Sequence, residues 1–141
     1  MPPPIRVGVA VELPEGVFNV IGEWRYRGIG LQWWLWELDD GAGRQRLLAK
    51  VGDTFYAPRF ESAQNMPEDE TVEFEATQYR LRHHGEARAE HNDAEDHDFW
   101  RADFRHYAAE GKVLIFTADN DETHRLAGEE LEEKLVRVYE P

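Results

Sequence analysis

Hydrophobic side chains in this chain recur at every second position, which is the period of a β-strand and not of a helix. Residues 17–27 show the pattern most clearly. Phe18, Val20, Trp24 and Tyr26 are predicted to share one face of a strand, while polar and charged residues occupy the other face. This alternation is typical of a strand with one face in water. Similar segments recur along most of the chain, so the period-two pattern favours a fold made of strands.

Three of the five tryptophans lie within four residues of each other, in a segment that is apolar on both faces. Residues 31–38 are therefore predicted to be a central strand, or a strand that a second layer covers. Alternation places Trp33 on one face with Glu37, and Trp34 on the other face with Trp36. One set is expected to build the core, and the other to cover a second layer or contact a partner.

Turn residues divide the alternating segments into short strands. Segments 44–50 and 53–60 are joined at Gly52 and Asp53, a pair that is typical of a hairpin turn. Further along, the alternation changes phase near Thr77, which predicts a bulge or a break into two strands.

Two polar segments are predicted to be loops. Residues 61–70 contain a proline and are expected to connect two halves of a single domain that spans 1–141, and residues 92–98 form a second, acidic loop. A short strand is predicted around residues 87–89. Residues 128–134 are the only fair candidate for a helix.

The chain is therefore predicted to be all-β, with about ten short antiparallel strands in a barrel or in two packed sheets and at most one short helix near residues 128–134. Its 141 residues fit one domain. No apolar run approaches the roughly 18 residues of a membrane span, and the N-terminus lacks the pattern of a secretory signal. The absence of cysteine excludes disulfides and thiolate chemistry, and it fits a cytoplasmic protein.

The formal charge of −13 is concentrated in the second half of the chain. Residues 1–60 hold seven acids and seven bases, whereas residues 61–141 hold the other 22 acids and nine bases. Such a surface repels phosphate backbones and anionic lipid, so nucleic-acid binding is not expected. The acidic half favours a basic protein partner, and the alternative is that its charge only maintains solubility.

Three groups of residues together resemble a bacterial family, domain of unknown function 4178. They are the strand Val17–Gly22, the tryptophan strand Trp33–Leu38 with its acidic-glycine turn and Leu47-Leu48, and the later segments Gly85-Glu86-Ala87, Tyr107 and Ala127–Leu131. The family's tryptophan strand often carries an acid where this chain has Leu35. The resemblance spans most of residues 7–138 and implies a compact β-rich domain. It also implies a setting beside membrane-stress proteins and polyamine-synthase-like enzymes, but no reaction.

Histidines and acids gather between residues 83 and 106, where imidazole and carboxylate groups suit a divalent metal ion. The pair His91 and His97 are the candidate ligands, although their spacing matches no known metal motif. The alternative is a solvated acidic loop, and neither a metal nor another cofactor is expected.

Glu37 is the candidate for acid–base chemistry, because neighbouring tryptophans could raise its pKa. The alternative places Glu37 at a strand end facing water. Ser62 is the only serine and has no nucleophile motif around it. No residue is assigned as catalytic, and the sequence favours a protein that is not an enzyme.

Three functional hypotheses follow. The first is a non-enzymatic binding or protein-interaction module, whose unidentified protein partner is basic or associated with membrane stress. Its aromatic surface would draw on Trp24, Arg25, Trp33, Trp34, Trp36 and Glu37. The second is a small-ligand-binding or enzymatic β-barrel with Glu37, Trp34 and the histidines at its mouth. The third is a metal-binding domain that uses His91 and His97.

Overall fold

The protein folds into a single antiparallel sheet of eleven strands in the computed structural model, which describes residues 5–93, 95–120 and 122–140. The strands are β1 (Ala10–Leu13), β2 (Gly16–Gly28), β3 (Leu31–Asp39), β4 (Gln45–Val51), β5 (Thr54–Ala63), β6 (Thr71–Phe74), β7 (Thr77–Asp93), β8 (His97–Ala109), β9 (Lys112–Ala118), β10 (Thr123–Leu131) and β11 (Arg137–Tyr139). Among the described residues, no helix has the length and hydrophobicity to cross a membrane.

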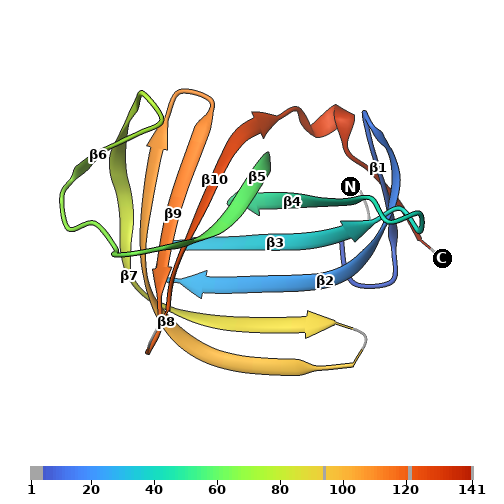
Figure 1. The fold of residues 1–141 in the computed structure, drawn as a ribbon, viewed down its shortest axis with the longest axis horizontal. Helices are drawn as coiled ribbons and strands as arrows, with labels where there is room; N and C mark the ends of the chain where they lie inside the picture. The colour runs from blue at the N-terminus through green and yellow to red at the C-terminus, as the bar shows by residue number, and fades with distance from the viewer. Residues whose placement is uncertain (1–4, 94, 121, 141) are drawn as a thin grey trace.

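Eight of the strands close into a ring, in the order β2-β3-β4-β5-β10-β9-β8-β7, because β2 pairs with both β3 and β7. In Figure 1, β2, β3 and β4 run almost at right angles to β9. The long strands β7 and β8 bend between these two directions. Every strand of the ring has a neighbour on both sides, although β4 and β5 pair over only three residues, and this closure confirms the prediction of an all-β, barrel-like fold.

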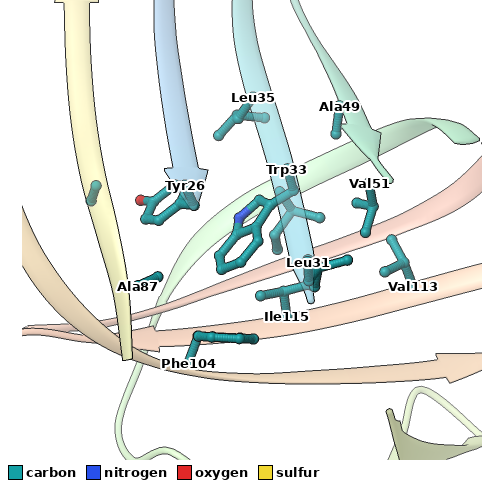
Figure 2. Close-up of a cluster of buried hydrophobic side chains, with 12 residues drawn as sticks. Tyr26, Leu31, Trp33, Leu35, Ala49, Val51, Ala87, Phe104, Val113 and Ile115 are labelled. Carbon is teal, nitrogen blue, oxygen red and sulfur yellow. The ribbon is translucent and has the colours of Figure 1, made fainter. Parts of the chain in front are cut away.

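The interior of the ring is filled by apolar side chains from all around the barrel. Trp33 lies at its centre and is almost fully buried. Its indole stacks on the ring of Tyr26, with centroids 4.7 Å apart, and contacts Phe104 at 5.0 Å. Figure 2 shows these three side chains among Leu31, Val113 and their neighbours. The interior of the barrel is therefore a packed core around Trp33.

Two covers pack on the outside of the ring. β1 and β11 cover one side, where Phe18, Trp36 and Leu48 are buried. β6 and the residues before it cover another side, over Tyr79, Leu114 and Phe116. The second cover is held by Tyr107, whose hydroxyl donates a hydrogen bond of 2.8 Å to the carbonyl oxygen of Asp69. These covers explain why several strands are apolar on both faces, as the sequence predicted for residues 31–38.

Strand β2 does not keep one face from end to end, and the predicted common face of Phe18, Val20, Trp24 and Tyr26 is wrong. The register with β3 shifts between Val20 and Gly22, so the strand bulges there. Phe18 and Val20 consequently pack outside the ring under β1, whereas Trp24 and Tyr26 point into the barrel. One extra residue exchanges the two faces.

Three further predictions need correction. The segment 128–134 is strand up to Leu131, because β10 pairs there with β5, and only a 3-10 turn follows at Glu133–Leu135. Residues 87–89 belong to the long strand β7. Most of the predicted loop 92–98 is β7 and β8, whose pairing extends to Asn92 and His97; Ala94 lies outside the described residues. In each case pairing with a neighbouring strand overrides local polarity.

The hairpin and phase-change predictions agree with the structure. β4 and β5 are joined at Gly52 and Asp53. The break near Thr77 separates β6 from β7, and its turn residues Glu75 and Ala76 both have positive φ. The polar loop predicted at residues 61–70 begins after Ala63, where β5 ends.

Gly28 is required by the packing of Phe104. A Cβ added at residue 28 would lie 2.6 and 2.7 Å from two carbons of that ring, which is itself fully buried. We expect Gly28→Ala to lower the free energy of unfolding by about 1–3 kcal/mol, as measured by urea denaturation. In the double variant Gly28→Ala/Phe104→Leu, the smaller side chain at residue 104 leaves room for the added Cβ. The free energy of unfolding should therefore fall by less than the sum of the two single losses. Strict additivity would contradict this explanation.

Ala76 has a φ of 63°, a conformation that disfavours side chains with a Cβ. We expect Ala76→Gly to raise the free energy of unfolding by up to about 1 kcal/mol, because glycine adopts this conformation without the same steric cost. The matched control is Gly111→Ala, which places a Cβ at a φ of 68° and should act in the opposite direction. Thermal denaturation of both variants checks the prediction, and a destabilised Ala76→Gly would contradict it.

Candidate functional site

The predicted tryptophan cluster is divided among three environments. Trp33 is in the barrel core. Trp36 is buried beneath the outer cover, and its Nε1 donates a hydrogen bond of 3.1 Å to Oε2 of Glu23. Burial raises the pKa of Glu23, while the bond from Trp36 opposes this shift. Trp34 is half-buried on the outer face of the barrel. The run therefore does not form a single binding surface.

A cavity of about 590 Å³ occupies one end of the barrel. We call it the mouth cavity; it is lined by Trp24, Leu35, Glu37, Leu38, Gln45, Arg46, Leu47, Pro58, Arg59, Phe60 and Glu61. Trp24 comes from the second half of β2, and the other lining residues come from the beginning of β4 and from the middle and later parts of β3 and β5. Its walls combine two aromatic rings and several aliphatic side chains with five polar or charged residues.

The mouth cavity lies where β4 and β5 separate. The two strands pair only at their joined ends, from Ala49 with Tyr56 to Val51 with Thr54. Beyond this, residues 45–48 pair only with β3 and residues 57–63 only with β10. Pro58 lies in the part of β5 that has no partner on the β4 side, where its lack of an N–H is tolerated. The separation of β4 from β5 thus provides an opening in the side of the barrel.

Glu37 lies inside the mouth cavity, at the end of β3. Alternation along β3 places it on the same face as Trp33 and Leu35, as the sequence predicted. Its carboxyl lies over Gly22, where an added Cβ would be 3.4 Å from Cδ of Glu37 and 3.5 Å from Oε2. The absence of a side chain at residue 22 leaves space for the carboxyl. Glu37 is half-buried and faces the cavity, in contrast to the alternative of a residue that faces water.

Three of the four charged residues that line the mouth cavity interact with an oppositely charged residue. Arg46 forms an ion pair with Glu15 at 3.2 Å, and Arg59 forms one with Glu75. Glu61 accepts a hydrogen bond of 2.8 Å from Arg125, which holds the pKa of Glu61 below its usual value. Glu37 forms no ion pair with any residue that the structure describes. Its carboxylate is therefore available to a ligand.

Histidines contribute to the walls around this end of the barrel. The imidazole of His91 packs against the indole of Trp24, with ring centroids 4.3 Å apart. On the opposite wall, His124 stacks on Phe60 at 5.0 Å. Both rings support aromatic residues that line the cavity. Sequence reasoning missed His124, because it lies far from the cluster between residues 83 and 106.

The predicted metal ligands do not meet. His91 packs against Trp24 inside the barrel, whereas Nε2 of His97 lies 3.0 Å from the carboxylate of Glu90 on the outside. Asn92 pairs with His97, so His91 and His97 belong to opposite faces of the sheet. Across residues 5–93, 95–120 and 122–140, no group of three or more suitable side chains converges as in a metal site. This geometry does not favour the metal hypothesis.

Trp34 is absent from the mouth, contrary to the second functional hypothesis. It lies on the outer face of β3 next to Arg25 and Lys50, whose charged groups are each 5.9 Å from its ring. Trp24 is the tryptophan that lines the cavity. Alternation along β3 places Trp34 on the face opposite Glu37, and the bulge in β2 places Trp24 on the inner face.

A pair of histidines lies in the barrel interior near the turn that joins β2 to β3. His106 is 8% exposed, and its Nδ1 lies 3.1 Å from Nδ1 of His83. Burial, assisted by the charges of His83 and Arg82, lowers the pKa of His106 to about 4. His106 is therefore neutral at pH 7.

The low pKa of His106 links stability to pH. Below its unfolded-state pKa of 6.5, the unfolded chain binds a proton that the folded protein does not. Stability should therefore fall as the pH decreases from 6.5 towards 4, by on the order of 3 kcal/mol in total from this residue. Urea denaturation across this range should give a shallower pH dependence for His106→Gln than for the natural protein. The exposed His84 provides the control, since His84→Gln should leave the slope unchanged; equal slopes for all three proteins would contradict the prediction.

An antiparallel barrel with a cavity at one end is an architecture that small-ligand-binding proteins use. The chain belongs to the family described as Domain of unknown function (DUF4178), whose model matches residues 6–140. The match confirms the family predicted from the sequence. None of the curated proteins or solved structures compared with the chain is significantly similar to it. The basic or membrane-stress-associated partner stays a prediction.

Proposed function

We propose that this protein is a non-enzymatic module that binds a small molecule in the mouth cavity. The ligand has an apolar, preferably flat body and a positively charged amine. The observation that carries the proposal is the carboxylate of Glu37, which has no ion-pair partner among the described residues and faces a cavity lined by Trp24 and Phe60. A cytoplasmic location is proposed as well, which the lack of cysteine favours.

The apolar walls would hold the body of the ligand. Trp24 and Phe60 have ring centroids 6.0 Å apart, and each is supported from behind by a histidine. Aromatic faces attract cations as well as apolar groups, so the same walls favour an amine over a carboxylate. Arg46 and Arg59 do not reverse this preference, because Glu15 and Glu75 neutralise them.

Binding is favoured over catalysis because Glu37 lacks a second ionisable group beside it. General acid–base or nucleophilic chemistry needs a partner within hydrogen-bond distance. Among the described residues, none forms such a contact with the Glu37 carboxylate. A lone carboxylate among aromatic rings is suited to hold a cation in place.

Three probes of similar shape and different charge test the proposal: phenethylamine, phenethyl alcohol and phenylacetate. Binding is followed by NMR through the indole N–H signal of Trp24, assigned with Trp24→Phe. Phenethylamine should bind best. Glu37→Gln should weaken its binding roughly ten- to hundredfold, from the 1.5–3 kcal/mol of a hydrogen bond to a charged group.

Glu61→Gln is the matched control, since Glu61 lines the same cavity but is engaged by Arg125. This variant should bind phenethylamine almost as the natural protein does. A preference for phenylacetate, equal losses in both glutamine variants, or no binding of any probe would overturn the proposal.

A further inference from the structure

A second surface lies on the outside of the barrel, between the two covers. There the outer faces of β2, β3, β4 and β7 carry a group that we call the basic patch: Arg25, Arg27, Trp34, Lys50 and Arg88. Arg27 and Arg88 are exposed, and the other three residues are partly exposed. None of them lines the mouth cavity.

Strand register places these side chains in two adjacent rows. In one row, Lys50 lies beside Trp34, and Trp34 beside Arg25. Both cations flank the indole, each with its charged group 5.9 Å from the ring centroid. In the next row, Arg27 lies directly opposite Arg88. Arg25 and Lys50 thus flank one partly exposed tryptophan, and Arg27 and Arg88 lie in the adjacent row.

The four bases of the patch form no close ion pair with any described residue, although the chain has 29 acids and only 16 lysines and arginines. Two acids lie near Arg25, namely Glu90 directly opposite it on β7 and Glu23 on the same strand. Glu90 contacts His97 at 3.0 Å, and Glu23 accepts a hydrogen bond from Trp36.

Two features of the patch cost stability. Like charges directly opposite each other destabilise a strand pair, as at Arg27 and Arg88. In addition, Nε of Arg25 is buried and has no hydrogen-bond partner among the described residues. An anionic group bound between Arg27 and Arg88 would remove the repulsion between them.

We propose that the basic patch docks a short acidic segment of a partner protein. Arginine forks bind carboxylates in a bidentate manner, and a partly exposed tryptophan beside arginine is a common centre of protein interfaces. A long polyanion or an anionic membrane fits less well, because the net charge of −13 on the whole chain would repel it. A short segment meets only the local positive charge.

The probe is a fluorescein-labelled peptide that contains six glutamates around one central leucine. A second peptide, in which lysines replace the glutamates, carries the opposite charge. Fluorescence polarisation should show that the intact protein binds the glutamate peptide, more weakly as salt increases. Arg27→Glu/Arg88→Glu should reduce the affinity at least tenfold, and Trp34→Ala should reduce it without changing the salt dependence. The control is Arg80→Glu/Arg82→Glu, which makes the same charge change on exposed residues of β7 outside the patch and should retain most of the binding.

Other binding partners of the basic patch would give different results in these experiments. Failure of the intact protein to bind the glutamate peptide, or equal losses in both double variants, would overturn the proposal. Tighter binding of single-stranded DNA through the same arginines would assign the patch to nucleic acid instead. Salt-sensitive self-association in sedimentation experiments, abolished by Arg27→Glu/Arg88→Glu, would assign it to a second copy of this chain. Circular dichroism of each variant shows whether lost binding reflects lost folding.

Discussion

The stack of Tyr26 on Trp33 is the interaction on which the rest of the structure depends. It joins β2 to β3 inside the ring, and Phe104 from β8 packs against the same indole. Burying these rings supplies a large share of the apolar area that a small barrel needs. The stack also fills the middle of the barrel, and the mouth cavity lies beyond it, where Trp24 and Glu37 are. Neighbouring segments of the same strands thus form the core and line the cavity.

Local alternation predicts much of this arrangement from the sequence. The two faces of residues 31–38 follow directly from the period of a strand, and so does the placement of Trp33 with Glu37 on the inner face. Glycine and aspartate at residues 52 and 53 correctly mark a hairpin. These features need only residues that are close together in the chain.

The features that the sequence does not predict depend on distant pairing or on a single inserted residue. Closure of the ring requires β2 to pair with β7, about sixty residues later, and no local pattern specifies that contact. The acidic composition around His97 resembles a loop, although pairing with β7 makes it a strand. The bulge after Val20 exchanges the faces of β2, which is why Trp24 reaches the mouth.

The short pairing between β4 and β5 has a consequence for how the barrel accommodates change. Three residue pairs connect these strands, whereas β7 and β8 pair over almost their full lengths. A barrel whose strands separate at a single short pairing can vary its circumference there while its other hydrogen-bonded ladders stay intact. The size of the space beside Glu37 is therefore set by the spread of two backbones as well as by the bulk of side chains. A change in the length of this one hairpin would alter that space without repacking the aromatic core.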